Sequence, residues 1–261
     1  MIYIIFLLFT FAILAILFYQ WQFFMVFTPT FFRKEELGDD YQILSVTTED
    51  GFELEGVVYE PHEMYRKLAS VDATLLFFAG RSHDSVGLIQ RLSKQFPHTR
   101  IITFNYRSYG RSEGKINEKN ILSDGLKIAE LVQKNYGDFY LLGFSLGSVV
   151  ASYLASKKKV KGLFLIGSFD SVPLLAKEKY GVCLSWIMRY KLDTTTLVKH
   201  IDADTYLFVS VDDETTYIKN ARNLKNHVKN LSSYKELEGL SHKELLWDDE
   251  VIDHINGVIN A

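Results

Sequence analysis

The sequence predicts an α/β fold, with a mostly parallel sheet of about eight strands, helices on both faces and one N-terminal transmembrane helix. Two observations predict it. From residue 42 onward, apolar runs of strand length alternate with patterns of helical period. Before that, no charged residue occurs between Met1 and Phe32. We therefore expect a membrane anchor over residues 1–32, followed by one globular domain over residues 33–261.

The N-terminal segment is long enough to cross a bilayer. Ile2 to Tyr19 is interrupted only by Thr10, and as a helix this run extends about 27 Å. An aromatic belt typical of the membrane interface follows it, made of Trp21, Phe23, Phe24 and Phe27. A cleaved signal peptide would need basic residues before the apolar run and a small-residue cleavage site after it. A soluble core helix would show a polar face. The segment has none of these features, so we expect an uncleaved anchor.

Charge and cysteine content indicate the compartment. Arg33 and Lys34 are the cations nearest the span, and both follow it, which places the globular domain in the cytoplasm by the positive-inside tendency. Cys183 is the only cysteine, so no intrachain disulfide can form.

The net charge of -3 and the 23% of charged residues are ordinary for a globular protein. We expect no nucleic-acid partner.

The globular part opens with a hairpin. Strands at 42–47 and 53–59 are joined through Glu49-Asp50-Gly51, a turn signal. Further strands are expected at 74–78, 100–105, 139–142, 162–166, 206–209 and 234–238, and helices at about 86–96, 119–135, 146–157, 215–230 and 248–260. Repeated strand–helix units after an antiparallel hairpin indicate a mostly parallel sheet.

One insertion breaks this alternation. Residues 168–200 contain no strand pattern, yet they carry large apolar side chains such as Leu175, Tyr180 and Trp186. A long connection of this kind is usually functional, and we interpret it as a small cap.

Ser145 has the sequence context of a catalytic nucleophile. It stands between Gly143 and Gly147 in a G-x-S-x-G pattern, directly after a predicted strand and before a predicted helix. A serine on such a sharp turn has strained backbone angles and projects above the sheet edge, and the flanking glycines avoid collisions of a Cβ atom. The helix N-terminus behind the serine favours developing negative charge.

A serine nucleophile needs a histidine base and a carboxylate that orients it, which follow in the order Ser, acid, His in this arrangement. The histidines after Ser145 are His200, His227, His242 and His254. His227 and His254 fall in predicted helices, and His200 precedes the loop that supplies the acids. His242 follows the last predicted strand and is our candidate base.

The acid is expected just after the preceding strand. The loop there offers Asp212, Asp213 and Glu214. We choose Asp213, with Asp212 as the main alternative, because an orienting acid is buried beside its histidine while its neighbours are solvated.

An oxyanion hole needs two backbone N–H groups directed at the substrate oxygen. One is expected from Leu146, the residue after the nucleophile. The other is expected from the loop after the third strand, where the amide of Arg81 is our first choice and that of Ser82 the alternative.

These residues resemble the α/β-hydrolase superfamily, and within it a membrane-anchored branch with a short cap that includes esterases, acyl-thioesterases, lysophospholipases and serine-aminopeptidase-like proteins. The resemblance covers about residues 42–259. It is carried by Gly143–Ser148, by residues 105–114, which are similar to the family's D-Y-R-G-Y-G-x-S-x-G loop, by residues 168–171 at the start of the cap, and by Asp213, which matches the aspartate of the family's G-x-x-D segment.

Three positions depart from the family pattern. Ala79 replaces the usual His before the oxyanion loop, Ser210 replaces Gly, and Thr216-Tyr217 replace Val-Pro. Because the oxyanion donor is a backbone amide, Ala79 is compatible with activity.

The resemblance and the residues together imply a serine hydrolase that forms an acyl-enzyme at Ser145, with His242 and Asp213 completing the triad. We expect an ester or thioester substrate that is lipid-like or acylated, and no metal or organic cofactor. Three alternatives remain: a catalytically silent scaffold protein, a serine peptidase, and an acyltransferase with the same triad.

Overall fold

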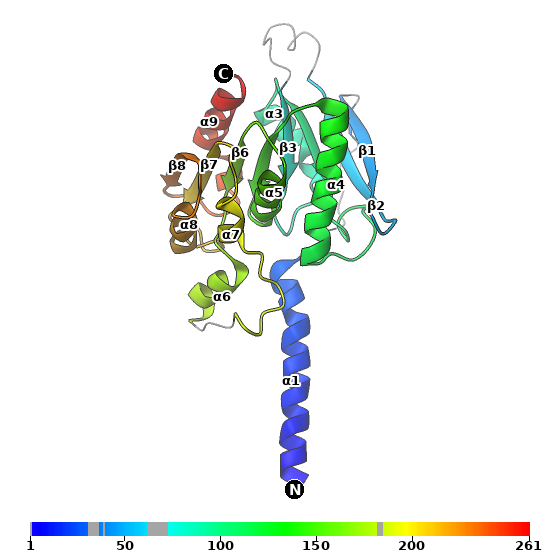
Figure 1. Ribbon diagram of the computed structural model, residues 1–261, viewed down its shortest axis with the longest axis vertical. Coiled ribbons are helices and arrows are strands. Elements are labelled where there is room, and N and C mark those ends of the chain that lie inside the picture. The colour runs from blue at the N-terminus through cyan, green and yellow to red at the C-terminus, as the bar shows by residue number, and fades with distance from the viewer. Residues whose placement is uncertain (1, 31–36, 39, 62–72, 182–184) are drawn as a thin grey trace.

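The computed structural model describes residues 2–30, 37–38, 40–61, 73–181 and 185–261. A long helix, α1 (Ile2–Val26), projects from a globular domain that contains a sheet covered by helices (Figure 1). The predictions about membrane sidedness and about disulfides depend on Arg33, Lys34 and Cys183. These three residues lie outside the described residues.

The sheet has eight strands in the order β1-β2-β4-β3-β5-β6-β7-β8. The strands are β1 (Tyr41–Thr47), β2 (Glu53–Tyr59), β3 (Thr74–Phe78), β4 (Arg100–Phe104), β5 (Tyr140–Phe144), β6 (Leu163–Ile166), β7 (Thr205–Ser210) and β8 (Leu231–Leu237). The β1–β2 and β2–β4 pairs are antiparallel, and all other pairs are parallel. The predicted hairpin and mostly parallel sheet are confirmed.

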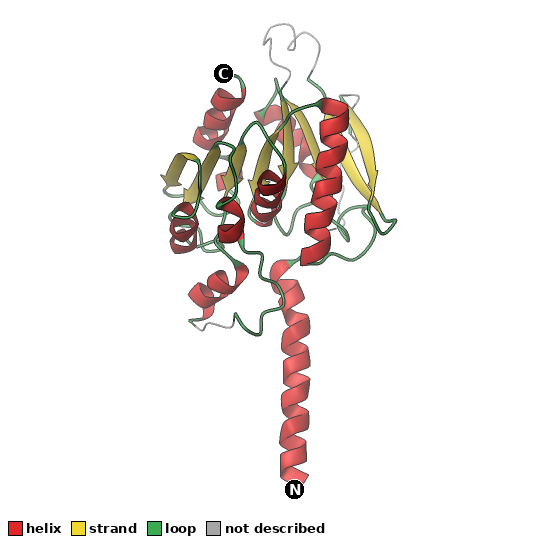
Figure 2. Ribbon diagram, in the orientation of Figure 1, coloured by secondary structure: helices red, strands yellow, loops and turns green. Residues whose placement is uncertain are grey.

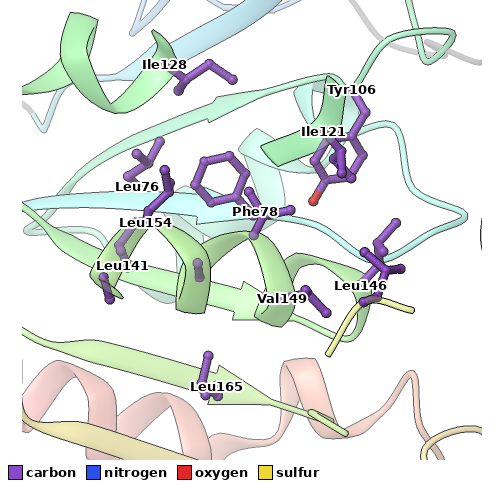
Figure 3. Close-up of a cluster of buried hydrophobic side chains, with 14 of the residues drawn as sticks. Leu76, Phe78, Tyr106, Ile121, Ile128, Leu141, Leu146, Val149, Leu154 and Leu165 are labelled. Atoms are coloured by element: carbon purple, nitrogen blue, oxygen red, sulfur yellow. The ribbon is translucent and has the colours of Figure 1, made fainter. Parts of the chain in front are cut away.

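Helices cover both faces of the sheet (Figure 2). The helical elements are η1 (Val86–Leu88), α3 (Ile89–Gln95), α4 (Glu118–Tyr136), α5 (Leu146–Lys157), α6 (Val172–Tyr180), α7 (Thr194–Val198), α8 (Ile218–Lys225), η2 (Leu245–Trp247) and α9 (Asp249–Ile259). Helices α4, α5, α7 and α8 contribute to one buried cluster, and η1, α3, η2 and α9 to another. Figure 3 shows part of the first cluster, to which Phe78 of β3, Leu141 of β5 and Leu154 of α5 contribute.

One predicted helix is shorter in the structure. The pattern at 215–230 predicts a single helix, but α8 covers only Ile218–Lys225. At its start, the amides of Thr215 and Thr216 donate to the Asp213 carboxylate. After Lys225 the chain continues as turns whose amides bond three residues back. The local contacts of the Asp213 loop thus replace the first helical turn.

Helix α1 is, within the described residues, the one helix long and apolar enough to cross a membrane. Its side chains from Ile2 to Leu17 are mostly exposed, whereas its last turn enters the domain, where Val26 and the following Phe27 are buried. The Phe27 ring packs edge-on against Tyr190 of the cap, with 5.1 Å between centroids. Pro29 lies just beyond, where it disfavours further helix. The helix is therefore joined to the domain by packing as well as by the chain.

Arg107 of the family-like loop has a structural role. Its guanidinium is buried and bonds to Asp124 on α4 at 2.7 Å and to Asp50 in the β1–β2 turn at 2.6 Å. Burial raises the pKa of Asp124 above its usual value, although the contact with Arg107 acts in the opposite direction. The arginine thus ties the opening hairpin and α4 to the end of β4.

Candidate active site

The turn that carries Ser145 has the strained geometry that the sequence predicts. Ser145 lies between β5 and α5 with φ 53° and ψ -116°. A Cβ atom on Gly143 would lie 2.6 Å from the Gly147 carbonyl oxygen, and one on Gly147 would lie 1.9 Å from the Phe78 carbonyl oxygen. Any larger residue at either position would force the turn open, because backbone atoms cannot yield as a flexible side chain does.

The structure brings Asp213 and His242 together. The imidazole Nδ1 lies 2.6 Å from Asp213 Oδ2. The carboxylate also accepts the backbone N–H of Thr215 at 2.7 Å, the N–H of Thr216 at 2.9 Å and the Thr216 hydroxyl at 2.6 Å. Burial raises the pKa of Asp213, but the hydrogen bonds from His242 and Thr216 outweigh burial and hold it below its usual value. The acid is thus ionised and fixed in orientation.

Asp212, the alternative acid, has a different contact. Its Oδ2 accepts the Gly239 N–H at 2.6 Å, which fixes the start of the His242 loop from the solvent side. Asp212 lies in a turn, and of the two carboxylates that of Asp213 is the one that forms a hydrogen bond with the imidazole.

The other downstream histidines, all of which the structure describes, lie elsewhere. His254 packs on the rings of Tyr206 and Phe208. His227 Nδ1 lies 2.8 Å from the Asn223 carbonyl oxygen, and His200 is exposed after α7.

The imidazole of His242 lies beside the Ser145 turn. Its ring packs against the ring of Phe144, with 4.9 Å between centroids. Its Cε1 comes within 3.0 Å of the place that a Cβ on Gly167 would occupy. Gly167 directly follows β6, whose Ile166 carbonyl accepts the Ser145 N–H at 2.9 Å. Within the described chain, no residue forms a hydrogen bond with the Ser145 hydroxyl; such contacts often tighten only when substrate binds.

The two expected oxyanion donors lie with Ser145 on one cavity, whose lining includes both Arg81 and Leu146. Leu146 is the first residue of α5, so its N–H has no acceptor within the helix. In the part of the chain that the structure describes, neither this amide nor that of Arg81 donates a hydrogen bond. Ser82, the alternative donor, is not among the lining residues.

Two buried tyrosines hold the loop that carries Arg81. The Tyr106 hydroxyl donates to the Ala79 carbonyl at 2.8 Å, and the Tyr109 hydroxyl donates to the Arg81 carbonyl at 2.5 Å. Burial raises the pKa of both phenols, so they remain protonated donors. Both belong to the loop similar to the family's D-Y-R-G-Y-G pattern. This support is present even though Ala79 stands where the family has His.

We expect Tyr109→Phe to lower kcat about tenfold with little change in KM, because a loosened Arg81 loop aims its amide less well at the transition state. Deleting a whole oxyanion donor costs more, about 10²- to 10³-fold. Steady-state kinetics on a soluble ester checks this. Tyr59→Phe is the matched control, since it removes a hydroxyl-to-carbonyl contact, here to Pro97 at 3.2 Å, far from Ser145. Equal kcat values for the two variants would contradict the role assigned to Tyr109.

The cavity has a volume of about 350 Å³ and contains parts that the sequence did not reveal. One wall comes from the last turns of α1 and another from α6 of the cap. The sequence contains one signal for the contact between α1 and the cap, which is Gln22, a polar residue in an apolar helix. It is buried, its Nε2 donates to the Ile187 carbonyl at 3.3 Å, and its Oε1 accepts the Arg189 N–H at 2.6 Å. Among the described residues, no group of three or more His, Cys, Asp or Glu gathers to hold a metal ion.

A mostly parallel sheet with a serine on the tight turn between β5 and α5, and an acid–histidine pair on the loops after β7 and β8, defines an α/β hydrolase. The sequence model of the alpha/beta hydrolase fold matches residues 75–234. The chain belongs to this family. The curated proteins include no significant match to the sequence.

Solved structures with the same fold include several hydrolases. An esterase from Pyrococcus furiosus superposes with a TM-score of 0.67 at 15% identity, covering 90% of this chain and 97% of that one. A membrane phospholipase A, described as a bacterial virulence factor, gives 0.63 at 15% identity, covering 85% and 88%. A hydrolase from Pseudomonas aeruginosa gives 0.61 at 13% identity, covering 86% and 98%. At these identities the likeness establishes the fold.

Proposed function

We propose that the chain is a serine hydrolase that cleaves a carboxylic ester or thioester of a lipid-like or acylated substrate. The observation that carries the proposal is the Asp213–His242 pair packed beside the strained Ser145 turn. Esterases and a phospholipase among the similar structures agree with this class of reaction.

In the proposed mechanism, His242 Nε2 accepts the proton of Ser145 as its hydroxyl attacks the carbonyl carbon. Nδ1 faces ionised Asp213, so it carries the other ring proton and leaves Nε2 as the base. The amides of Arg81 and Leu146 hold the oxyanion. The protonated imidazole then gives its proton to the leaving alcohol or thiol. Water, deprotonated by the same nitrogen, then attacks the acyl carbon, and the imidazole returns the proton to the Ser145 oxygen as the free acid leaves.

We further propose that α1 is an uncleaved membrane anchor and that the domain lies on the cytoplasmic side. The anchor is supported by the exposure of the apolar side chains of α1 and by the burial of its last turn in the domain. The assignment of the domain to the cytoplasmic side rests on the positions of Arg33 and Lys34 in the sequence.

Purified full-length protein should be tested on ester, thioester and amide bonds with acyl chains of increasing length. We expect ester or thioester hydrolysis and free acid as product. Faster cleavage of amides would indicate a peptidase, and transfer of the acyl group to an added alcohol would indicate an acyltransferase. No turnover of any bond would favour a silent scaffold.

A further inference from the structure

We propose that the end of the membrane helix is part of the enzyme: residues 21–26 of α1 form one wall of the acyl pocket, and the substrate is a single-chain amphiphile drawn from the membrane surface. This inference rests on the proposed function and adds the substrate class and the residues that select it.

The cavity over Ser145 lies between α1 and the cap. From α1 it is lined by Trp21, Phe24, Met25 and Val26, and from α6 by Val172, Leu175 and Ala176. These side chains are apolar, and the same cavity is lined by Ser145 and by Arg81 and Leu146, whose amides are assigned to the oxyanion. An acyl chain that lies between the two helices would thus have its carbonyl end directed toward Ser145.

The cap is fixed to α1 by specific contacts. Both amide atoms of Gln22 bond to the cap backbone. Beside them, the rings of Trp21 and Tyr180 lie 6.3 Å apart, and the Arg189 guanidinium lies 4.7 Å from the ring centroid of Tyr19. The wall is therefore a built feature of the domain, although it lies at the end of a helix that otherwise projects away from it (Figure 1).

The same end of α1 reaches the oxyanion loop. The Arg81 guanidinium donates to the Met25 carbonyl, and the Thr28 N–H donates to the Arg81 carbonyl at 3.1 Å. The Thr28 N–H also lies 3.0 Å from the Tyr109 hydroxyl that supports this loop. The pocket wall and the amide assigned to the oxyanion are thus held by one set of contacts.

The mouth of the pocket lies at the depth of lipid headgroups. Residues 2–18 extend about 26 Å as a helix, which is close to the hydrocarbon thickness of about 30 Å. The next residues, Tyr19 and Trp21, then lie at the interface, together with Trp186 of the cap, which is 83% exposed. Lys179 and Glu214 also line the cavity, giving it charged groups for a polar headgroup.

The volume of the cavity favours a substrate with one acyl chain over a substrate with two. About 350 Å³ is at the lower end of the range of about 300–1,000 Å³ for small-molecule pockets. We therefore commit to a substrate with one acyl chain and a polar head, such as a lysophospholipid.

The test compares two substrates with full-length protein in dioleoyl-phosphatidylcholine vesicles: palmitoyl-lysophosphatidylcholine in the vesicle, and water-soluble p-nitrophenyl butyrate. Met25→Trp fills the pocket and Phe24→Ala removes part of its wall. We expect each change to lower kcat/KM for the palmitoyl lipid about tenfold and kcat/KM for butyrate by a smaller factor, because the short acyl chain contacts less of the wall. An unchanged thermal unfolding temperature shows that each variant is folded.

Phe11→Ala is the matched control. Phe11 is 71% exposed and Phe24 67% exposed on the same helix, but only Phe24 lines the cavity. If the two alanine variants hydrolyse the palmitoyl lipid alike and Met25→Trp has no effect, the wall is not part of the site. Hydrolysis of the diacyl host lipid as fast as the palmitoyl lipid would overturn the single-chain assignment. Wild-type protein that cleaves neither ester would overturn the proposed function itself.

Discussion

Replacing Ser145 by alanine is expected to lower kcat by about 10⁵- to 10⁶-fold, and His242→Ala by a similar factor. Each change stops the covalent route completely, because attack by the hydroxyl and removal of its proton are one step. The double variant should therefore be no slower than either single variant. Release of free acid from a soluble ester, followed with purified protein, measures all three.

Ser152→Ala is the control for the serine change. Ser152 lies on α5, the helix that follows Ser145, is fully buried, and its hydroxyl has no partner among the described residues. Its loss should leave kcat within about threefold of wild type, since changes of this kind away from functional groups have small effects. Strictly additive losses for Ser145→Ala and His242→Ala would contradict a shared step.

Asp213→Asn is expected to lower kcat about 10⁴-fold while leaving the fold intact. An amide of the same shape can donate a hydrogen bond to Nδ1, which favours the tautomer whose Nε2 carries the proton and cannot act as a base. Thr215 and Thr216 donate hydrogen bonds to the side chain at this position, and this arrangement suits a carboxylate. Activity against pH and thermal unfolding should be measured together, so that a loss of rate is separated from a loss of structure.

Asp212→Asn separates the two neighbouring acids. Asp212 bonds the Gly239 amide on the solvent side, so its replacement should cost about tenfold at most. A larger loss for Asp212→Asn than for Asp213→Asn would reverse the assignment of the acid.

The sheet and most helices follow from the sequence because their signals are local. Strand runs such as residues 74–78, and the glycines around Ser145, are explained by contacts within one or two elements. The helix predicted at 215–230 fails at its start because the Asp213 carboxylate draws in the amides that begin it. The hydrophobic periodicity of the sequence does not reveal an acceptor that competes for these backbone amides.

The walls of the site depend on contacts between distant segments, and no local pattern encodes these. Nothing in the apolar run of α1 indicates that Met25 lies against Arg81, and the polarity of Gln22 marks that residue without revealing its partners in the cap. The roles of Tyr106 and Tyr109 likewise appear only when their loop meets the one after β3. For the same reason, the sequence favours Asp213 without excluding Asp212, and the contact between Asp213 and His242 appears only in the structure.

The most direct test of the account is to treat the full-length protein with a fluorophosphonate and to locate the adduct by mass spectrometry. We expect one phosphonyl group on Ser145, formed at a rate that falls strongly in His242→Ala and is abolished in Ser145→Ala. A protein that stays unmodified, or that is modified equally when Ser145 is alanine, would contradict it.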